Sequence, residues 1–575
     1  MGFVGSLGIV LGWLCLGLVL ARIAGLARLG ERPPGRVFPL LTALFVLASM
    51  PTIWRLAGYT ADDAWIIARY AAQLVEHGRP VFNPGEPINA VTTPLTMLEM
   101  AVLYAVSPAG VMALHKSLGV ALAALGLAVV GFATRSAAAL CVFAVLVALS
   151  PYHALWLVGG LEPPVLGFLL LLVAVLTLQR GRSTERPADA GGAGAPDDRD
   201  SAPGRRPLWI ALLASLAFAT RFDSVLFTAP VLLYVLWRCP RARDRAAVAL
   251  TAAAAPAVLL AFNLLYYGDA LPTSFHLKAR TALGWHGFVH VVEFFTYSGL
   301  FVLFAFVAAT RGGPTADRGL AERLRSDPAV AVWTGVFLAC VPYATLTATA
   351  HMMYGFRAFV PYLVVVAFLL AREVAARTDG TPAHLSSYRA GLLTAVLLVA
   401  LLQAANTLLM PRPALNATRV GEFRSHWDVP SYLAELERAA LAVRADWRER
   451  DGDAAPHVYS PNEGIVGYTL LELPVHGRMT GYRRDCPVTL PEMALASRYA
   501  IVEEPFVGLH LRGIDLSDWV PVYSGDEFSR GHFPGQRSRV LAYRNPRPRP
   551  WDFEYGVADP CPGDGPARRP ASPTD

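Results

Sequence analysis

The strongest constraint in this sequence is a series of long apolar runs between Phe3 and Met410. A bilayer core takes about 20 helical residues to cross, and runs such as 37–59 and 246–267 reach that length. Composition points the same way, because 54% of the 575 residues are hydrophobic and 16% are charged, whereas about a quarter of a globular protein is charged. These features exclude a soluble enzyme and a disordered scaffold, and they predict a polytopic membrane protein.

The runs predict an all-α membrane domain over residues 1–410 with about 12 or 13 transmembrane helices. The first run, Phe3–Val19, has no basic residue in front of it, so we expect a retained span rather than a signal peptide. Residues 94–106 are apolar but short for a crossing. Further runs lie near 112–134, 137–150, 164–178, 208–220, 224–237, 246–267, 293–309, 329–349, 359–371 and 390–410.

Arginines set the expected topology, because cytoplasmic loops of membrane proteins are enriched in basic residues. Four arginines within 22–36 place that loop in the cytoplasm and the loop 60–93 outside. If 94–106 is a partial or external helix, the flexible, low-complexity loop 179–207 also lies inside. By the same parity residues 411–575 form an external domain, and their charges, prolines and short alternating runs predict a soluble α/β or β-rich fold. The expected location is the cell (plasma) membrane.

The basic charge does not indicate a nucleic acid partner. The formal net charge is +6, but the arginines are scattered beside apolar runs instead of being gathered with aromatic residues on one face. We therefore expect the lipid bilayer, and no nucleic acid, as a partner. Cys486 and Cys561 are the cysteines beyond the last run, and an oxidising exterior would favour a disulfide between them.

The polar side chains that could carry chemistry fall on the expected external face. An interfacial enzyme collects such groups at one membrane face, whereas a transporter or channel places them along a path near mid-span. The distribution favours an enzyme over the alternative, a polytopic lipid or solute transporter. The candidates are Asp62, Asp63, Arg69, Tyr70, Asn83, Glu86, Glu162, Arg221, Asp223, Asp269, His276, Lys278 and Arg357.

The pair Asp62 and Asp63 has two interpretations. Thr60-Ala-Asp-Asp63 opens a helical pattern and fits a capping box. Alternatively, paired carboxylates at a membrane surface can act as a general base toward a sugar hydroxyl, or hold a divalent cation such as Mg²⁺, Mn²⁺ or Ca²⁺ against a phosphate. Asp62, Arg69 and Gln73 recur at i, i+7 and i+11, so they share a helix face, and this sharing makes Asp62 the slightly preferred base.

Other candidates also have structural interpretations. Lys278 could be a snorkelling side chain at the end of a span. Glu162 could be a charge at a helix N-terminus, just before Pro163. The stretch 81–86 predicts a turn centred on Pro84-Gly85.

Several pieces of the expected external loops occur in a fixed order. They are Asp62-Asp-Ala-Trp-Ile-Ile-Ala-Arg-Tyr70, Gly78-Arg-Pro-Val-Phe-Asn-Pro-Gly-Glu86, Thr92-Thr-Pro-Leu95, Gly159-Gly-Leu-Glu-Pro163, Thr220-Arg-Phe-Asp223, 267–279 and Gly355-Phe-Arg-Ala-Phe-Val-Pro361. Together they resemble the GT-C-fold glycosyltransferases that use polyprenyl-phosphate sugars, most closely the terminal arabinofuranosyltransferase type. The resemblance covers residues 38–375, and Ser460–Tyr468 resembles the start of that family's external domain.

This resemblance implies roles for individual residues. Asp62 or Asp63 would activate the acceptor hydroxyl, and any metal would sit at the same two residues. Lys278, with His276 and Arg221, would meet the lipid-linked phosphate, as cations do. The other residues implied to bind substrate are Arg69, Tyr70, Asn83, Glu86, Glu162, Asp223 and Arg357.

Two stretches depart from the family pattern. Asn89-Ala-Val91 stands where relatives carry an acidic residue, glycine and tyrosine, and His351-Met-Met-Tyr354 stands where they carry an aspartate and a tryptophan. The donor sugar and the acceptor therefore stay open. The expected function is transfer of a sugar, with arabinofuranose as one candidate, from a polyprenyl-phosphate donor to a hydroxyl of a cell-envelope glycan or glycolipid.

Overall fold

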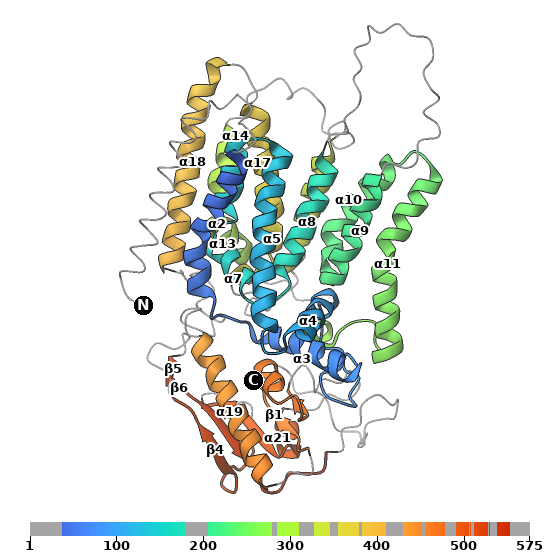
Figure 1. Ribbon diagram of the computed structural model, residues 1–575, viewed down its shortest axis with the longest axis vertical. Coiled ribbons are helices and arrows are strands. Elements are labelled where there is room, and N and C mark those ends of the chain that lie inside the picture. The colour runs from blue at the N-terminus through green and yellow to red at the C-terminus, as the bar shows by residue number, and fades with distance from the viewer. Residues whose placement is uncertain are drawn as a thin grey trace.

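The computed structural model describes residues 37–179, 205–278, 285–309, 327–345, 355–378, 382–409, 429–450, 455–477, 490–504, 507, 511–526, 528–529 and 537–551. Figure 1 shows a bundle of long helices and, at its lower end, a smaller domain built from residue 429 onward. Two helices, α3 (Asp62–His77) and α4 (Pro94–Val106), lie between these parts. The short apolar stretch 94–106 is therefore a helix at the edge of the bundle.

The bundle follows the apolar runs of the sequence closely. Its helices are α2 (Val37–Leu56), α5 (Val111–Thr134), α6 (Ala137–Leu146), α7 (Pro151–Leu157), α8 (Pro163–Leu178), α9 (Arg205–Thr220), α10 (Val225–Arg238), α11 (Ala242–Tyr267), α13 (Trp285–Tyr297), α14 (Leu300–Ala309), α16 (Pro328–Thr345), α17 (Val360–Thr378) and α18 (Pro382–Leu409). The short helix α12 (Thr273–Lys278) follows α11. This arrangement confirms the predicted all-α membrane domain.

Fewer described helices meet the requirements of a membrane span than the 12 or 13 expected. Four stretches, within α2, α5, α11 and α18, are long and apolar enough to cross a membrane. If each of two bent helix pairs is counted as one span, the number of described spans rises to six. The expectation counted apolar runs, but α8 has 16 residues and α10 has 14, less than the roughly 20 that a perpendicular crossing takes. Helix length therefore accounts for part of the difference, and the first expected span lies outside the described residues.

Two of the runs are broken by identifiable residues. α6 and α7 meet at 73°, where Ser150 Oγ caps α7 and Pro151 occupies its first turn. α13 and α14 meet at 75° at Gly299, whose φ is 76°. A Cβ at Gly299 would lie 2.8 Å from Val399 of α18, so the bend also needs a residue without a side chain.

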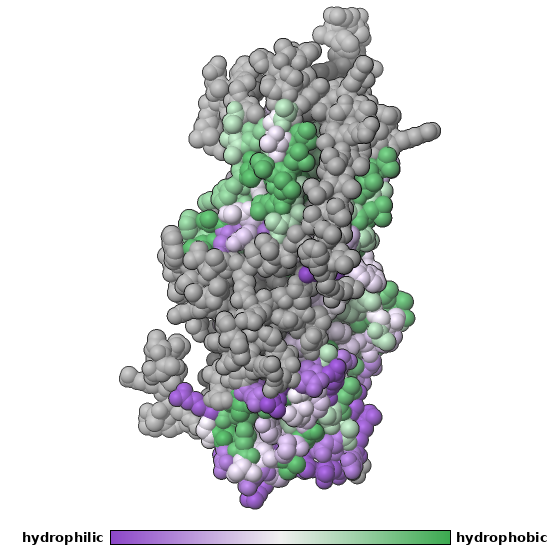
Figure 2. Space-filling view, turned by 90° about the vertical axis from the view of Figure 1, so that its left-hand side faces the viewer, coloured by the Kyte–Doolittle hydropathy of each residue, from purple (hydrophilic) through white to green (hydrophobic). Residues whose placement is uncertain are grey.

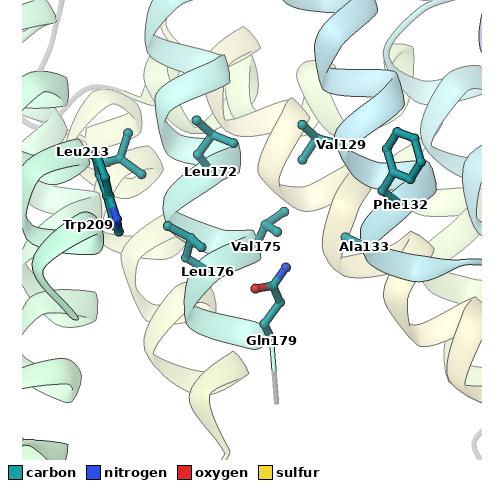
Figure 3. A pocket seen from close by; sticks show the side chains of 9 residues that line it. All are labelled: Val129, Phe132, Ala133, Leu172, Val175, Leu176, Gln179, Trp209 and Leu213. Atoms are coloured by element: carbon teal, nitrogen blue, oxygen red, sulfur yellow. The ribbon is translucent and has the colours of Figure 1, made fainter. Parts of the chain in front are cut away.

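The surface divides into an apolar and a polar part. In Figure 2 the described residues of the upper part are mostly hydrophobic, whereas hydrophilic residues gather on the lower domain. Large apolar side chains are exposed on the bundle, including Trp54, Leu250 and Leu265, as expected of a surface in contact with lipid. A groove of about 540 Å³ lies among α5, α8 and α9 and is almost wholly apolar, with Gln179 at its end (Figure 3).

The lower domain contains a mixed five-stranded sheet with the strand order β2-β1-β3-β7-β4. The strands are β1 (Val458–Tyr459), β2 (Val475–His476), β3 (Tyr499–Glu503), β4 (Val520–Ser524) and β7 (Val540–Arg544), and a separate ribbon pairs β5 (Phe528–Ser529) with β6 (Arg537–Ser538). β1 runs parallel to β2 and β3, while β7 is antiparallel to β3 and β4. The helices are α19 (Val429–Arg450), α20 (Glu463–Thr469) and α21 (Leu490–Ala496). The α/β alternative for this domain is confirmed.

Several sequence predictions lie outside the described residues. These are the first apolar run, the cytoplasmic loop 22–36, most of the loop 179–207, the stretch 351–354, and the pairing of Cys486 with Cys561.

Candidate active site

Five charged residues from four segments meet at the start of α3 and the ends of bundle helices. Asp63 lies in the first turn of α3, and Glu162 immediately precedes α8. Arg221 and Asp223 follow α9, and Arg357 lies just before α17. All five were candidate site residues from the sequence.

The five side chains form one continuous chain of ion pairs. Arg357 Nη1 donates to Asp63 Oδ2 at 2.9 Å, and Arg357 Nη2 lies 3.3 Å from Glu162 Oε2. Arg221 Nη1 donates to Glu162 Oε1 at 2.7 Å, and its Nε donates to Asp223 Oδ1 at 2.8 Å. Glu162 is therefore held between two guanidinium groups. We call Asp63, Glu162, Arg221, Asp223 and Arg357 the charge network.

Burial differs along the charge network. The Glu162 side chain is 0% exposed, whereas the Asp63 side chain is 41% exposed. Burial alone would raise the pKa of Glu162, but the charges of Arg357 and Arg221 lower it below the ordinary value. Burial also opposes the charge of Arg357, yet Glu162 and Asp63 raise its pKa. With every group charged, three carboxylates face two guanidiniums, so the network carries a formal charge of −1.

An unusual backbone places Arg357. Gly355 and Phe356 have φ values of 59° and 57°, and a left-handed conformation at a residue other than glycine costs about 1–3 kcal/mol. The conformation is held by packing: the Phe356 ring lies 4.8 Å from Tyr152, and Trp156 Nε1 donates to Gly355 O at 2.8 Å. These contacts fix the direction in which the Arg357 side chain points from the backbone.

Small residues bring the Glu162 loop against α3. Ala61 N donates to Gly159 O at 2.9 Å. Gly160 has φ 78°, and a Cβ there would lie 2.7 Å from Met112 Sδ. The two glycines therefore allow the close approach that sets Glu162 beside the start of α3.

Asp62 has a different environment from Asp63. Its two carboxylate oxygens accept from Gly464 N at 3.1 Å and Ile465 N at 2.9 Å, so Asp62 caps the N-terminus of α20 in the lower domain. The capping box predicted for Thr60 is wrong, because the N-cap residue of α3 is Ala61 and no side chain caps that helix. Asp62 is thus a cap, but of a helix about 400 residues further along the chain.

The hydroxyl of Thr60 accepts a hydrogen bond from Lys116 instead of capping α3. Lys116 Nζ donates to it at 2.7 Å and also donates to Tyr59 O at 2.7 Å and Ala57 O at 3.0 Å. Lys116 therefore holds the connection between α2 and α3.

Arg69 is fully buried and bonds to the lower domain. Its Nη groups donate to the carbonyl oxygens of Gly467, Leu470 and Leu473 and to Asn83 Oδ1, and its Nε donates to Phe82 O at 2.6 Å. A guanidinium has five N–H donors, and all five are used. Burial lowers the pKa of Arg69 to about 9, which keeps it charged at neutral pH.

The predicted helix face is confirmed, but it is not a solvated one. Asp62, Arg69 and Gln73 all contact the segment 464–473, with Gln73 Nε2 donating to Leu471 O at 3.3 Å. This face of α3 is therefore the surface on which α20 and the turn after it pack.

The loop after α3 contains the predicted turn. Glu86 N donates to Asn83 O at 3.2 Å, and Gly85 has φ 84°, as a type II turn requires. The Asn83 side chain pairs with both backbone groups of Val475 in β2, at 3.0 Å and 2.9 Å. Tyr70 donates to Ile88 O at 2.5 Å. Asn83 and Tyr70 therefore fix this loop between α3 and the sheet.

His276 and Lys278 lie on the short helix α12. His276 Nε2 is 2.9 Å from Asp269 Oδ2. Thr273 N donates to Asn89 O at 2.8 Å, so α12 is attached to the loop that follows α3. The backbone of Lys278 ends α12, and its side chain lies outside the described part.

Within the described part of the chain, the group that could hold a metal ion does not include Asp62 or Asp63. It consists of Glu86, His457 and His476. His476 is fully buried, and burial together with His457 and Arg69 lowers its pKa well below the ordinary value.

Sequence reasoning missed His457, His476 and Lys116 as side chains that build this region. The two histidines are 19 positions apart, which matches no short metal motif. The rarity of lysine could have pointed to Lys116, since it is one of only two lysines in the chain.

Comparison of the sequence with known protein families and with curated proteins finds no match. Solved structures do match. ArnT from Cupriavidus metallidurans bound to undecaprenyl phosphate superposes with a TM-score of 0.52 at 10% identity, covering 88% of this chain and 98% of that one. The apo state of the same protein gives a TM-score of 0.50 at 14% identity, covering 87% and 97%. This chain is therefore a multi-pass membrane protein with an ArnT-like GT-C fold.

Proposed function

We propose that this protein is a membrane glycosyltransferase that transfers a sugar from a polyprenyl-phosphate donor to a hydroxyl of a cell-envelope glycan or glycolipid. The observation that carries the proposal is the charge network, in which a half-exposed carboxylate is held by an arginine at the ends of bundle helices. The shared fold with ArnT, which has been solved with undecaprenyl phosphate bound, supports this assignment.

In this reaction Asp63 would be the general base. It is 41% exposed and is oriented by Arg357, whereas both oxygens of Asp62 bind backbone N–H groups of α20. The acceptor oxygen attacks the anomeric carbon, its proton moves to Asp63, and the bond from that carbon to the lipid phosphate breaks. The leaving phosphate carries away the electron pair of the broken bond, so cations that bind it favour the reaction.

We propose that a cation outside the charge network helps to bind the phosphate of the donor. The formal charge of the network is −1, and an anionic donor would be repelled unless positive charge were added. Lys278 and His276 on α12 are the candidates in the sequence, and a divalent cation is a second source of charge.

The sugar is proposed from the sequence resemblance. The pieces resembling terminal arabinofuranosyltransferases make polyprenyl-phosphate arabinofuranose the first donor to test. We further propose that the site faces the exterior of the plasma membrane, as the arginine distribution predicts.

The direct test is to identify the lipid-phosphate sugar that accumulates in cells lacking the protein, and then to supply that donor to the purified protein in detergent. Transfer to an acceptor hydroxyl with release of polyprenyl phosphate supports the proposal. Movement of an intact lipid or solute across vesicles, without cleavage of the sugar–phosphate bond, would establish the transporter alternative.

A pair of variants tests the added cation. Lys278→Ala should weaken donor binding more than Lys278→Arg, because arginine still neutralises a phosphate and alanine does not. Equal donor affinity in wild type and both variants would make Lys278 a snorkelling residue.

A further inference from the structure

Glu86, His457 and His476 come from three separate segments and converge at the junction of α3 with the lower domain. Glu86 ends the turn after α3, His457 precedes β1, and His476 is the last residue of β2. One ligand atom from each side chain lies within 4.8 Å of the other two. Nothing in the proposed transfer reaction uses these three groups.

The distances within this group suit one small divalent cation. His457 Nδ1 and His476 Nε2 are 2.8 Å apart, and His476 Nε2 is 3.7 Å from Glu86 Oε1. Ligands at about 2.0–2.1 Å from a tetrahedral zinc ion lie roughly 3.3 Å from one another, between these two values. The third pair, Glu86 and His457, lies within 4.8 Å, so small side-chain movements would place all three atoms around one ion.

The surroundings hold the ligands in place. Asn83 Nδ2 donates to Glu86 Oε2 at 2.8 Å, and the Asn83 side chain is itself paired with Val475 of β2. The Trp551 ring stacks on His457 at 4.1 Å and contacts His476 at 4.0 Å. Outer groups that orient ligands and cover a site in this way are typical of metal centres in proteins.

We propose that Glu86, His457 and His476 bind a zinc ion that fastens the loop after α3 to the sheet of the lower domain. Two neutral imidazoles and one carboxylate are zinc ligands of ordinary type, and a water molecule would fill the fourth position of a tetrahedral ion. The ion would connect residues from both parts of the molecule, beside the Arg69 and Asp62 contacts that join the same surfaces. Its role is structural and independent of the transfer reaction.

The test uses the full-length protein purified in detergent without chelators. We expect about one zinc per chain by elemental analysis, loss of that zinc on treatment with a strong chelator, and recovery of zinc and thermal stability when Zn²⁺ is returned. Cobalt(II) added to the stripped protein should give the visible absorption of a tetrahedral site.

Matched variants locate the ion. His457→Gln and Glu86→Gln should each lower zinc affinity at least tenfold, while His77→Gln, which changes an exposed histidine of α3, should leave it unchanged. His457 is the first choice because it is only partly buried. Stripped wild-type protein that takes up neither zinc nor cobalt would overturn the proposal, and so would uptake that is equal in the wild type and in a folded double variant. Both results are read from metal content, so they do not depend on glycosyl transfer.

Discussion

Arg357 and Asp63 are 294 positions apart in the sequence, yet Nη1 of the guanidinium lies 2.9 Å from Oδ2 of the carboxylate. The contact joins the loop before α17 to the first turn of α3, and Glu162 extends it to Arg221. Neighbouring aspartates in the sequence therefore have separate environments, because Asp62 faces α20 and Asp63 faces the charge network.

The two aspartates should respond differently to amide substitution. Asp63→Asn removes the proposed base, so turnover should fall by about 10² to 10⁴ while the protein stays folded and binds donor. Asp62→Asn keeps a capping oxygen, so it should cost a few tenths to about 1 kcal/mol of stability and leave most of the turnover. Transfer rates and thermal unfolding of both variants check this. Near-normal transfer by Asp63→Asn, or an inactive but well-folded Asp62→Asn, would contradict the assignment.

Arg69→Lys should loosen the lower domain from the bundle. Lysine has three N–H donors where arginine has five, so at least two of the five hydrogen bonds to Phe82, Asn83, Gly467, Leu470 and Leu473 are lost. At about 1.5–3 kcal/mol for each lost hydrogen bond to a charged group, we expect a clear drop in unfolding temperature and faster proteolysis after α18. Arg79→Lys, at an exposed position in the same region, serves as the control. An unchanged unfolding temperature for Arg69→Lys would show that these bonds contribute little.

Glu162 should give stability a specific pH dependence. Its pKa in the folded protein is below the ordinary value of 4.5, so its contribution is complete above about pH 4.5 and is lost as pH falls through the folded pKa. Glu162→Gln removes the carboxylate that Arg221 and Arg357 share, so it should lower the unfolding temperature at neutral pH, even though Asp223 and Asp63 still pair with these arginines. The difference from wild type should shrink in acid. Thermal unfolding between neutral pH and about pH 4 checks this, with the exposed Glu504→Gln as control.

Single cysteines in a cysteine-free background should report the topology. Glu86 is 8% exposed and therefore a poor position for labelling, whereas Arg79 is exposed in the same loop. Arg79→Cys should react with an impermeant thiol reagent from outside, and Ala195→Cys should react only after the membrane is opened. Labelling of position 79 from the cytoplasm alone would reverse the orientation and move the charge network to the other face.

For several candidate residues, the structure gives contacts that the sequence did not predict. Arg69, Tyr70, Asn83 and Glu86 were singled out as substrate ligands, but their described contacts are with the loop after α3 and the lower domain. A functional role and a docking role demand the same residue types, because both need buried hydrogen-bonding groups. Their contacts with residues 464–475 show the docking role, and substrate binding by these residues stays a prediction.

The local sequence predicted apolar helices in the membrane domain, the turn at Pro84-Gly85 and a soluble domain near the C-terminal end, which it left as α/β or β-rich. These features depend on local apolar length, periodicity and turn chemistry, which neighbouring residues carry. Only the folded structure shows that Asp63 pairs with Arg357, that Asp62 caps α20, and that Glu86 lies beside His457 and His476. Such contacts span hundreds of residues, and no local pattern encodes them because they depend on how whole helices and strands pack.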